Sequence, residues 1–412
     1  MTNNKIYVID VTNRDGVQTS RIGLAKLEKT IINRYLDRMG IWQSEFGFPV
    51  TKHEINYLNA NLELVKLGSI PRMRLSGWIR AVKEDVELAL KNVPELKYIN
   101  MSISTSDQMI QGKFKGKMTW EDILAKSGQA IDTAYELGIK DCALNAEDAS
   151  RTDVERLIEF AKNGKAHGAT RIRYCDTLGY DDPFTIYDKV HTLAKETKMN
   201  VELHCHNDLG MAVACSIAGA KAAVDAGVDA YINTTLNGIG ERAGNADFLS
   251  CILAIQKSSG FSKKYKLGGK IDLSQAYKVA QYASKCFQIP IPMNQVAVGD
   301  NAFAHESGIH ADGALKDHRN YELYDHKEVG RGHIVQIETG RHITTGEYSG
   351  IKGFKNMAGK YEIRFKDEDH ARQILDLVRY ANVHKQQPVT EDEVKFIAKY
   401  PQQARKIMTV TP

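Results

Sequence analysis

The chain has 412 residues, of which 42% are hydrophobic and 26% are charged. These proportions are typical of a globular protein and exclude a disordered or fibrous one. The 55 Lys and Arg residues against 51 Asp and Glu residues leave a net charge of +4, with no long block of one sign. Composition therefore indicates no nucleic-acid or membrane partner, and no run reaches the roughly 18 apolar residues of a membrane span.

The chain enters a strand-like run at Lys5, which leaves no room for a signal peptide before it. We therefore expect a cytoplasmic location. The six cysteines, at positions 142, 175, 205, 215, 251 and 286, include no CxxC pair. In a reducing compartment we expect them to be buried free thiols and not a disulfide framework.

Short β-rich runs recur along the first two thirds of the chain, and helix-like segments with apolar residues at steps of three and four lie between them. The predicted strands are 5–10, 41–46, 73–77, 98–104, 140–145, 171–176, 200–206 and 229–234. The clearest predicted helices are 24–39, 120–137, 153–167, 183–197 and 212–226.

Eight strand–helix alternations in about 260 residues match a (β/α)8 TIM barrel in number and length. We therefore predict an α/β protein whose residues 1–265 form a catalytic barrel. A doubly wound open sheet is the alternative, but no Gly-rich phosphate-binding motif follows the first strand.

The alternation stops near residue 265. Residues 263–270 (KKYKLGGK) read as a basic linker, and residues 289–293 (IPIPM) as a break punctuated by proline. We predict a helical linker subdomain over residues 266–330 and a small C-terminal α/β subdomain over residues 331–412. Within the latter, residues 340–354 (GRHITTGEYSGIKGF) read as a turn-rich hairpin or loop.

Polar motifs lie at the ends of several predicted strands, which meet at one mouth of a barrel. After the first strand comes DVTNRDGVQ, in which Asp15 can bind a metal and Arg14 can neutralise an anion. His204 and His206 are two residues apart on a strand, so both imidazoles can face one metal. A polar turn and two ordinary histidines are the alternative interpretations of these motifs.

Further motifs follow the other strands: NAED with Glu147, RYCDT from Arg173 to Thr177, and the Gly-rich NGIGERAGN ending at Asn245. Glu147 can act as an acid or base, although each motif can also be a helix cap or a turn. Outside the barrel, residues 305–313 (HESGIHADG) could form a second metal site, but we favour a general acid or base supplied to the mouth.

These motifs resemble the isopropylmalate/homocitrate synthase family, the acyl-CoA-condensing branch of the DRE-TIM metallolyases. The resemblance runs from Ile6 to about Gly330 and, more loosely, to the end of the chain. It departs from the usual DTTLRDGEQ opening at Val11, Asn13 and Val17. The residues that carry it are DVTNRDGVQ, SEFGFP, NAEDASRTD, CDTLG, HCHNDLGMAVA, NGIGERAGN and NAFAHESGIHADG.

The resemblance implies a reaction in which acetyl-CoA, as substrate, condenses with a 2-oxo acid on a divalent metal, Mg²⁺, Mn²⁺ or Zn²⁺. It also implies a domain-swapped homodimer in which His310 reaches the partner's site. The implied metal ligands are Asp15, His204 and His206, with Asn245 in or beside the coordination shell. The implied catalytic residues are Arg14, Glu147, His310 and Tyr321, and the substrate-facing positions include Gln18 and Thr177.

The identity of the acceptor depends on two further positions. Arg173 stands where isopropylmalate synthases have small or neutral side chains, which favours an acceptor with a second carboxylate. Homocitrate synthases have an arginine where this chain has Ala143, with Asn145 two residues before Glu147. We therefore favour oxaloacetate, giving citrate, over 2-oxoglutarate, giving homocitrate; Arg173 as a purely structural ion-pair partner stays open.

Other functions remain as alternatives. They are a 2-isopropylmalate or citramalate synthase, a lyase of the HMG-CoA lyase or aldolase type, and a non-catalytic metal-binding descendant. The end of the chain near residue 412 leads us to expect no full leucine-binding regulatory domain.

Overall fold

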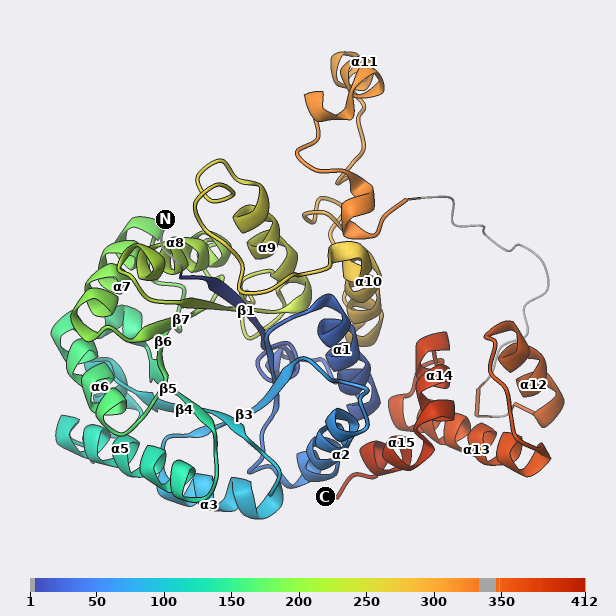
Figure 1. Ribbon diagram of the computed structural model, residues 1–412, viewed down its shortest axis with the longest axis horizontal. Helices are drawn as coiled ribbons and strands as arrows, with labels where there is room; N and C mark the ends of the chain where they lie inside the picture. The colour runs from blue at the N-terminus through green and yellow to red at the C-terminus, as the bar shows by residue number, and fades with distance from the viewer. Residues whose placement is uncertain (1–3, 333–345, 348, 412) are drawn as a thin grey trace.

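The eight predicted strands close into a parallel barrel in chain order, with β8 paired to β1 (Figure 1). The computed structural model describes residues 4–332, 346–347 and 349–411. The strands are β1 Ile6–Asp10, β2 Gln43–Gly47, β3 Arg74–Arg80, β4 Tyr98–Ser104, β5 Asp141–Glu147, β6 Arg171–Asp176, β7 Asn200–Cys205 and β8 Ala230–Thr234. The predicted TIM barrel is confirmed, and each predicted strand matches an observed one.

Amphipathic helices surround the barrel and bury their apolar faces against the outer side of the strands. They are α1 Lys26–Met39, α2 Ile55–Lys66, α3 Lys83–Asn92, α5 Trp120–Glu136, α6 Val154–Ala166, α7 Pro183–Thr197, α8 Ala212–Asp225 and α9 Phe248–Lys257. A short additional helix, α4 (Asp107–Gly112), lies in the loop after β4. Local caps define the helix starts: the Thr119 hydroxyl accepts the N–H of Asp122, and Asp182 precedes Pro183 at the start of α7.

The inside of the barrel is polar, unlike its outer side. Strand alternation points Glu45, Asn100, Arg173 and Glu202 inward, and all four are buried. Below them, Tyr7, Trp42 and Tyr231 pack together, and the guanidinium groups of Arg74 and Arg171 lie over the Trp42 ring. These aromatic rings close the N-terminal end of the barrel, so the cavity opens at the C-terminal end of the strands.

The predicted basic linker is part of the barrel's edge. Leu267 forms a bridge with Ile6 of β1, and the N–H groups of Ile6 and Gly268 bond across it at 2.9 and 2.7 Å. Helix α10 (Ala276–Phe287) then packs against α1. Helix α11 (Gly308–Lys316) stands away from the barrel and has no buried residue (Figure 1).

The C-terminal part differs from the predicted α/β subdomain. Its described residues, 346–347 and 349–411, contain no strand and form α12 Ile351–Lys360, α13 Glu368–Lys385, α14 Glu391–Lys399 and α15 Pro401–Met408. Phe354, Met357 and Ala358 are buried at helical spacing, which explains why the end of the predicted hairpin is helical. Residues 340–345 and 348 of that hairpin lie outside the described residues.

All six cysteines are buried and unpaired, as predicted. Within the described part of the chain, no helix combines the length and the apolar character needed to cross a membrane.

Candidate active site

A cavity of about 180 Å³ opens at the C-terminal end of the strands. Side chains from β3 to β7 and from the loops after β1 and β8 line it, so residues far apart in sequence meet there. Its lining is Arg14, Asp15, Gln18, Trp78, Ser102, Asn145, Glu147, Arg173, Cys175, Thr177, His204, His206, Glu241 and Arg242. Of the predicted barrel residues, only Asn245 is not in this lining, and it lies directly behind Asp15.

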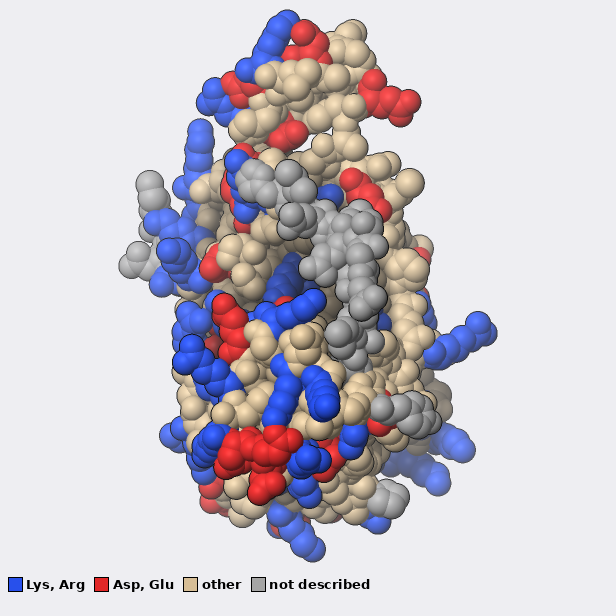
Figure 2. All heavy atoms as spheres, turned by 90° about the vertical axis from the view of Figure 1, so that its right-hand side faces the viewer, with Lys and Arg blue, Asp and Glu red and all other residues tan. Residues whose placement is uncertain are grey.

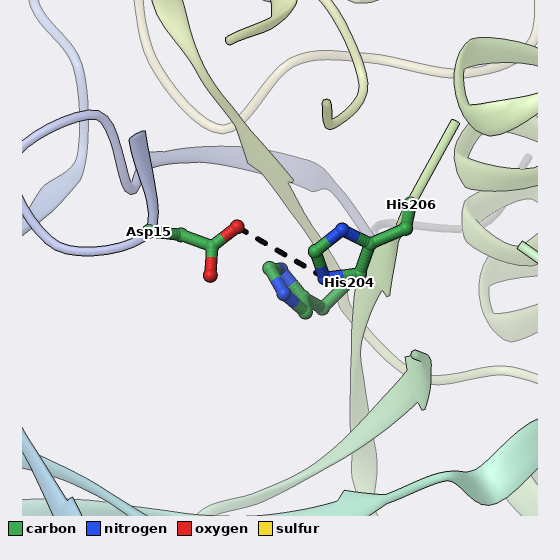
Figure 3. Close-up of side chains that lie close together, drawn as sticks. All are labelled: Asp15, His204 and His206. Carbon is green, nitrogen blue, oxygen red and sulfur yellow. Dashed lines mark ion pairs between the residues drawn. The ribbon is translucent and has the colours of Figure 1, made fainter. Parts of the chain in front are cut away.

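Asp15, His204 and His206 come together as one cluster (Figure 3). Each offers one ligand atom, and these atoms lie within 4.8 Å of one another. The two imidazole rings are perpendicular, with centroids 5.0 Å apart, and His206 Nε2 is 3.9 Å from Asp15 Oδ2. Asn245 Nδ2 donates to Asp15 Oδ2 at 2.5 Å. In the described part of the chain, no other group of three or more such side chains is this close.

The charge states of this cluster suit a cation. Burial lowers the pKa of His204 well below its usual value and also lowers the pKa of His206, so both rings are neutral. Burial alone would raise the pKa of Asp15, but the positive charge of Arg14 and the hydrogen bond from Asn245 outweigh it, so the pKa is lowered and the carboxylate is ionised. The buried Nδ1 atoms of both histidines and Oδ1 of Asn245 have no hydrogen-bond partner among the described residues. This donor set fits a divalent metal.

Arg14 is held rigidly beside the cluster. Its Nη1 donates to Asp15 and its Nε donates to Glu45, both at 2.6 Å, and its guanidinium carbon lies 5.7 Å from the centre of the Trp78 ring. Burial alone would raise the pKa of Glu45, but Arg14 and Arg173 hold it at about 2. Arg14 is therefore a fixed cation whose place is set before any ligand binds.

Arg173 faces the cavity, but two carboxylates of the protein already bind it. Its Nε donates to Glu202 at 2.7 Å, and its Nη2 contacts both Glu45 and Glu202. A bidentate grip on a substrate carboxylate, as the sequence led us to expect, would have to displace these partners. Nη1 has no hydrogen bond to any described residue, so Arg173 can offer a ligand one donor.

Glu147, at the end of β5, is bound by one side chain from the end of β4 and one from the loop after it. It accepts hydrogen bonds from the Ser104 hydroxyl and, at 2.6 Å, from Lys113 Nζ. Two residues earlier, Asn145 is 1% exposed, and both its amide oxygen and its amide nitrogen lack partners. Thr177 Oγ1 accepts the N–H of Asp148 at 2.9 Å.

His310 and Tyr321 lie together on the projecting segment around α11 and do not line the cavity of their own chain. Their rings stack with centroids 4.2 Å apart. His305 instead pairs with Glu322 at 3.1 Å. The alternative of a second metal site in residues 305–313 has no support among the described residues, because no second metal-type cluster occurs there.

Several residues of the site were not singled out from the sequence. Glu45, which lies in the SEFGFP motif, and Glu202, Ser104, Lys113 and Trp78 are part of the site without having been predicted from the sequence. For Glu45 and Glu202 a signal existed, since an acidic residue inside a predicted strand of a barrel needs a cationic partner. Lys113 gave no such signal because it lies in a loop.

Family models match most of the chain. The model described as HMGL-like matches residues 5–282, and the model described as homocitrate synthase post-HMGL domain-like matches residues 297–385. The hydroxymethylglutaryl-CoA lyase of Pseudomonas aeruginosa has the same barrel, with a TM-score of 0.56 at 15% identity over 76% of this chain and 99% of that one.

Curated relatives extend over nearly the full length. The chain is 58% identical to "Citrate (Re)-synthase" of Dehalococcoides mccartyi over 99% of both chains. It is 36% identical to "2-isopropylmalate synthase 2" of Caldanaerobacter subterraneus over 95% of this chain and 94% of that one. It is 33% identical to "Homocitrate synthase 1" of a Nostoc species over 96% of this chain and 97% of that one. The chain therefore belongs to the HMGL-like family, in the branch that contains these synthases.

Proposed function

We propose that this protein, as a Re-type citrate synthase, joins the methyl carbon of acetyl-CoA to the keto carbon of oxaloacetate, and that water then hydrolyses the thioester to release citrate and CoA. The observation that carries this proposal is the 58% identity to a citrate (Re)-synthase over 99% of both chains, together with a cavity that combines a metal-type cluster and cations. Condensation with a 2-oxo acid is also common to the other synthases named above.

Asp15, His204 and His206 would hold a divalent metal, with Asn245 beside it. When bound, such an ion polarises the keto group of the acceptor as a Lewis acid. Arg14, fixed by Glu45 and Asp15, places a positive charge next to the oxygen on which negative charge develops. Neutral imidazole and carboxylate ligands accommodate Mg²⁺, Mn²⁺ and Zn²⁺ alike.

The distal carboxylate of the acceptor would lie against β5 and β6. Asn145 and Arg173 are paired in register on these strands. Asn145 Nδ2 has no partner among the described residues, and Arg173 uses Nε and Nη2 to bind Glu45 and Glu202, which leaves its Nη1 without a hydrogen bond to a described residue. Thr177 and Gln18 line the same cavity and would bind the acceptor's other oxygens. Two single donors on neighbouring strands suit one carboxylate, which supports a dicarboxylic acceptor over the apolar tail of 2-oxoisovalerate.

Proton transfer would fall to Glu147 and His310. Glu147 is at the cavity wall and would take a proton from the acetyl methyl group, so that the carbon can attack the keto carbon. His310 and the adjacent Tyr321 would come from a second copy of the chain, because in their own chain they stand on the projecting segment around α11. Ile309, Leu315 and Leu323 of that segment are 75%, 90% and 72% exposed, which supports a partner that covers them.

The test is an acceptor screen with purified protein and added divalent metal. Thiol release from acetyl-CoA should be fastest with oxaloacetate and slower with 2-oxoglutarate, pyruvate and 2-oxoisovalerate. Labelled acetyl-CoA followed by stereospecific cleavage of the citrate should place the label on the arm expected for Re-face addition. Thiol release that is fastest with 2-oxoisovalerate or pyruvate would instead assign the isopropylmalate or citramalate reaction.

A further inference from the structure

The loop after β4 carries an unusual run of cations at the edge of the cavity. Residues 113–117 read KFKGK, and the side chains of Lys113, Lys115 and Lys117 are all exposed. Lys115 and Lys117 form no ion pair with any described residue. The run is adjacent to the candidate base, because Lys113 Nζ donates to Glu147 at 2.6 Å and to the Ser104 hydroxyl at 3.1 Å.

The backbone fixes this run as a tight turn. Lys115 and Gly116 both have left-handed conformations, with φ of 54° and 66°. The N–H of Lys117 bonds to the carbonyl of Phe114 at 2.9 Å, and the N–H of Phe114 bonds to the carbonyl of Met109 in α4 at 3.2 Å. A left-handed conformation is unfavourable in free energy for Lys115 because this residue has a Cβ atom. The surrounding backbone hydrogen bonds must offset that free energy. The backbone of residues 113–117 therefore has a defined conformation, which fixes the points from which the three lysine side chains extend.

Several other cations in the loops at the mouth are neutralised by carboxylates of the protein, whereas Arg21 and Lys52, after β1 and β2, form no ion pair with a described residue. The pairs are Arg242 with Asp208, Arg151 with Asp148, Arg80 with Asp85, and both Lys26 and Lys29 with Glu54. An anionic group that arrives at the mouth therefore meets uncompensated positive charge at Lys115 and Lys117.

The size of the cavity shows that part of an acyl-CoA must lie outside it. Its 180 Å³ is less than the roughly 300–1,000 Å³ of pockets that enclose a drug-sized ligand, and an acyl-CoA is larger still. If the acetyl group reaches Glu147, a pantetheine arm that leaves the cavity on the side of the loop after β4 passes Lys113, which binds Glu147. The phosphates at the far end of that arm then need cations on the rim.

We propose that the turn formed by residues 113–117 binds the phosphates of the acyl-CoA, with Lys115 and Lys117 as the phosphate-contacting residues. This inference rests on the proposed function, since it assigns a place to the nucleotide end of its acyl donor. The turn then acts as an anchor that leads the acetyl group toward Glu147, and it contributes to affinity for the donor and not to the chemical step.

The experiment compares a Lys115→Ser/Lys117→Ser double variant with a Lys91→Ser/Lys140→Ser double variant. The second pair carries the same loss of charge on exposed lysines at the opposite end of the barrel. Three donors are used: acetyl-CoA with three phosphates, acetyl-dephospho-CoA with two, and acetyl-pantetheine with none. Lys113 stays unchanged because it contacts Glu147.

We expect the first variant to raise KM for acetyl-CoA about tenfold with kcat little changed, as two lost charge-assisted contacts predict. The defect should shrink with acetyl-dephospho-CoA and vanish with acetyl-pantetheine, while the control variant behaves as wild type. An equal defect with all three donors, or none with acetyl-CoA, would overturn the assignment.

Binding of 3′-phospho-ADP, measured by calorimetry, separates this inference from the proposed function. The wild type should bind it and the Lys115→Ser/Lys117→Ser variant should bind it at least several-fold more weakly. A wild type that binds this nucleotide yet releases no thiol from acetyl-CoA with any 2-oxo acid would refute the proposed function alone. Equal binding by wild type and variant would refute the phosphate site alone.

Discussion

Asn145 and Arg173 are register partners on β5 and β6, but they differ in how strongly other side chains bind them. This difference governs the effect of mutating each residue. Arg173 is bound by Glu45 and Glu202, so its removal would leave two buried carboxylates without a cation. The side chain of Asn145 makes no hydrogen bond to any described residue, so its removal costs the fold little. A side chain that is buried and polar but unpartnered is the one most free to serve a ligand.

The substitution Asn145→Ala should therefore lower kcat/KM for oxaloacetate about tenfold, the value of one hydrogen bond to a charged group, while leaving the melting temperature nearly unchanged. Steady-state kinetics and thermal unfolding test both parts. Arg173→Asn is the comparison and should lower the melting temperature clearly. An Asn145→Ala enzyme with wild-type kinetics would show that this amide does not contact the acceptor.

His204 offers a second residue-scale test. We expect His204→Ala to abolish thiol release and reduce bound divalent metal to background together, because one of three ligands is lost. Metal content after dialysis, measured by mass spectrometry, reports the second effect. His191→Ala, on α7 outside the cavity, should keep both metal and activity. Full metal content in the His204 variant would contradict its assignment as a ligand.

Among the elements, the eight strands were predictable because each is a short β-rich run followed by an amphipathic segment. Helix α12 was not, because Gly350 and Gly353 and the β-branched residues before them suggest turns and strands, whereas the burial of Phe354 favours a helix. The pairing of Arg173 was also beyond the sequence, since Glu45 lies 128 residues away along the chain. Partners that are so far apart in the sequence come together only when the barrel closes, so the sequence alone does not reveal the pair.

Helix α11 supports a prediction about assembly. Mixing two inactive variants, Glu147→Gln and His310→Ala, should restore about a quarter of wild-type activity, because half of the dimers are mixed and each mixed dimer has one intact site. Co-expression, or unfolding and refolding together, allows subunit exchange. If His310 served its own chain, every site would lack one residue and the mixture would stay inactive.

For the whole molecule, a buried charge cluster ties the C-terminal helices to the barrel. Lys385 of α13 lies 3.0 Å from Glu28 of α1 and 2.5 Å from Glu393 of α14, and the Tyr282 hydroxyl of α10 donates to Glu393 at 2.8 Å. Three helices thus meet at one ammonium group and α10 joins them through Glu393, which makes the C-terminal part a continuation of the barrel's outer layer.

Lys385→Met should accordingly destabilise the protein by about 3–5 kcal/mol, since two buried carboxylates lose their cation. Urea unfolding measures this directly. Lys395→Met removes the same charge from an exposed pair with Glu391 and should cost less than about 1 kcal/mol. Similar losses in the two variants would mean that the buried cluster contributes no more than a surface pair.

The polar interior of the barrel also decides where new specificity can be engineered. Arg14, Glu45, Arg173 and Glu202 hold one another in place, so replacing any of them unbalances a charge inside the fold. The side chain of Asn145 has no hydrogen-bond partner among the described residues. A library of variants at this position can therefore be selected for activity with other keto acids without loss of the fold.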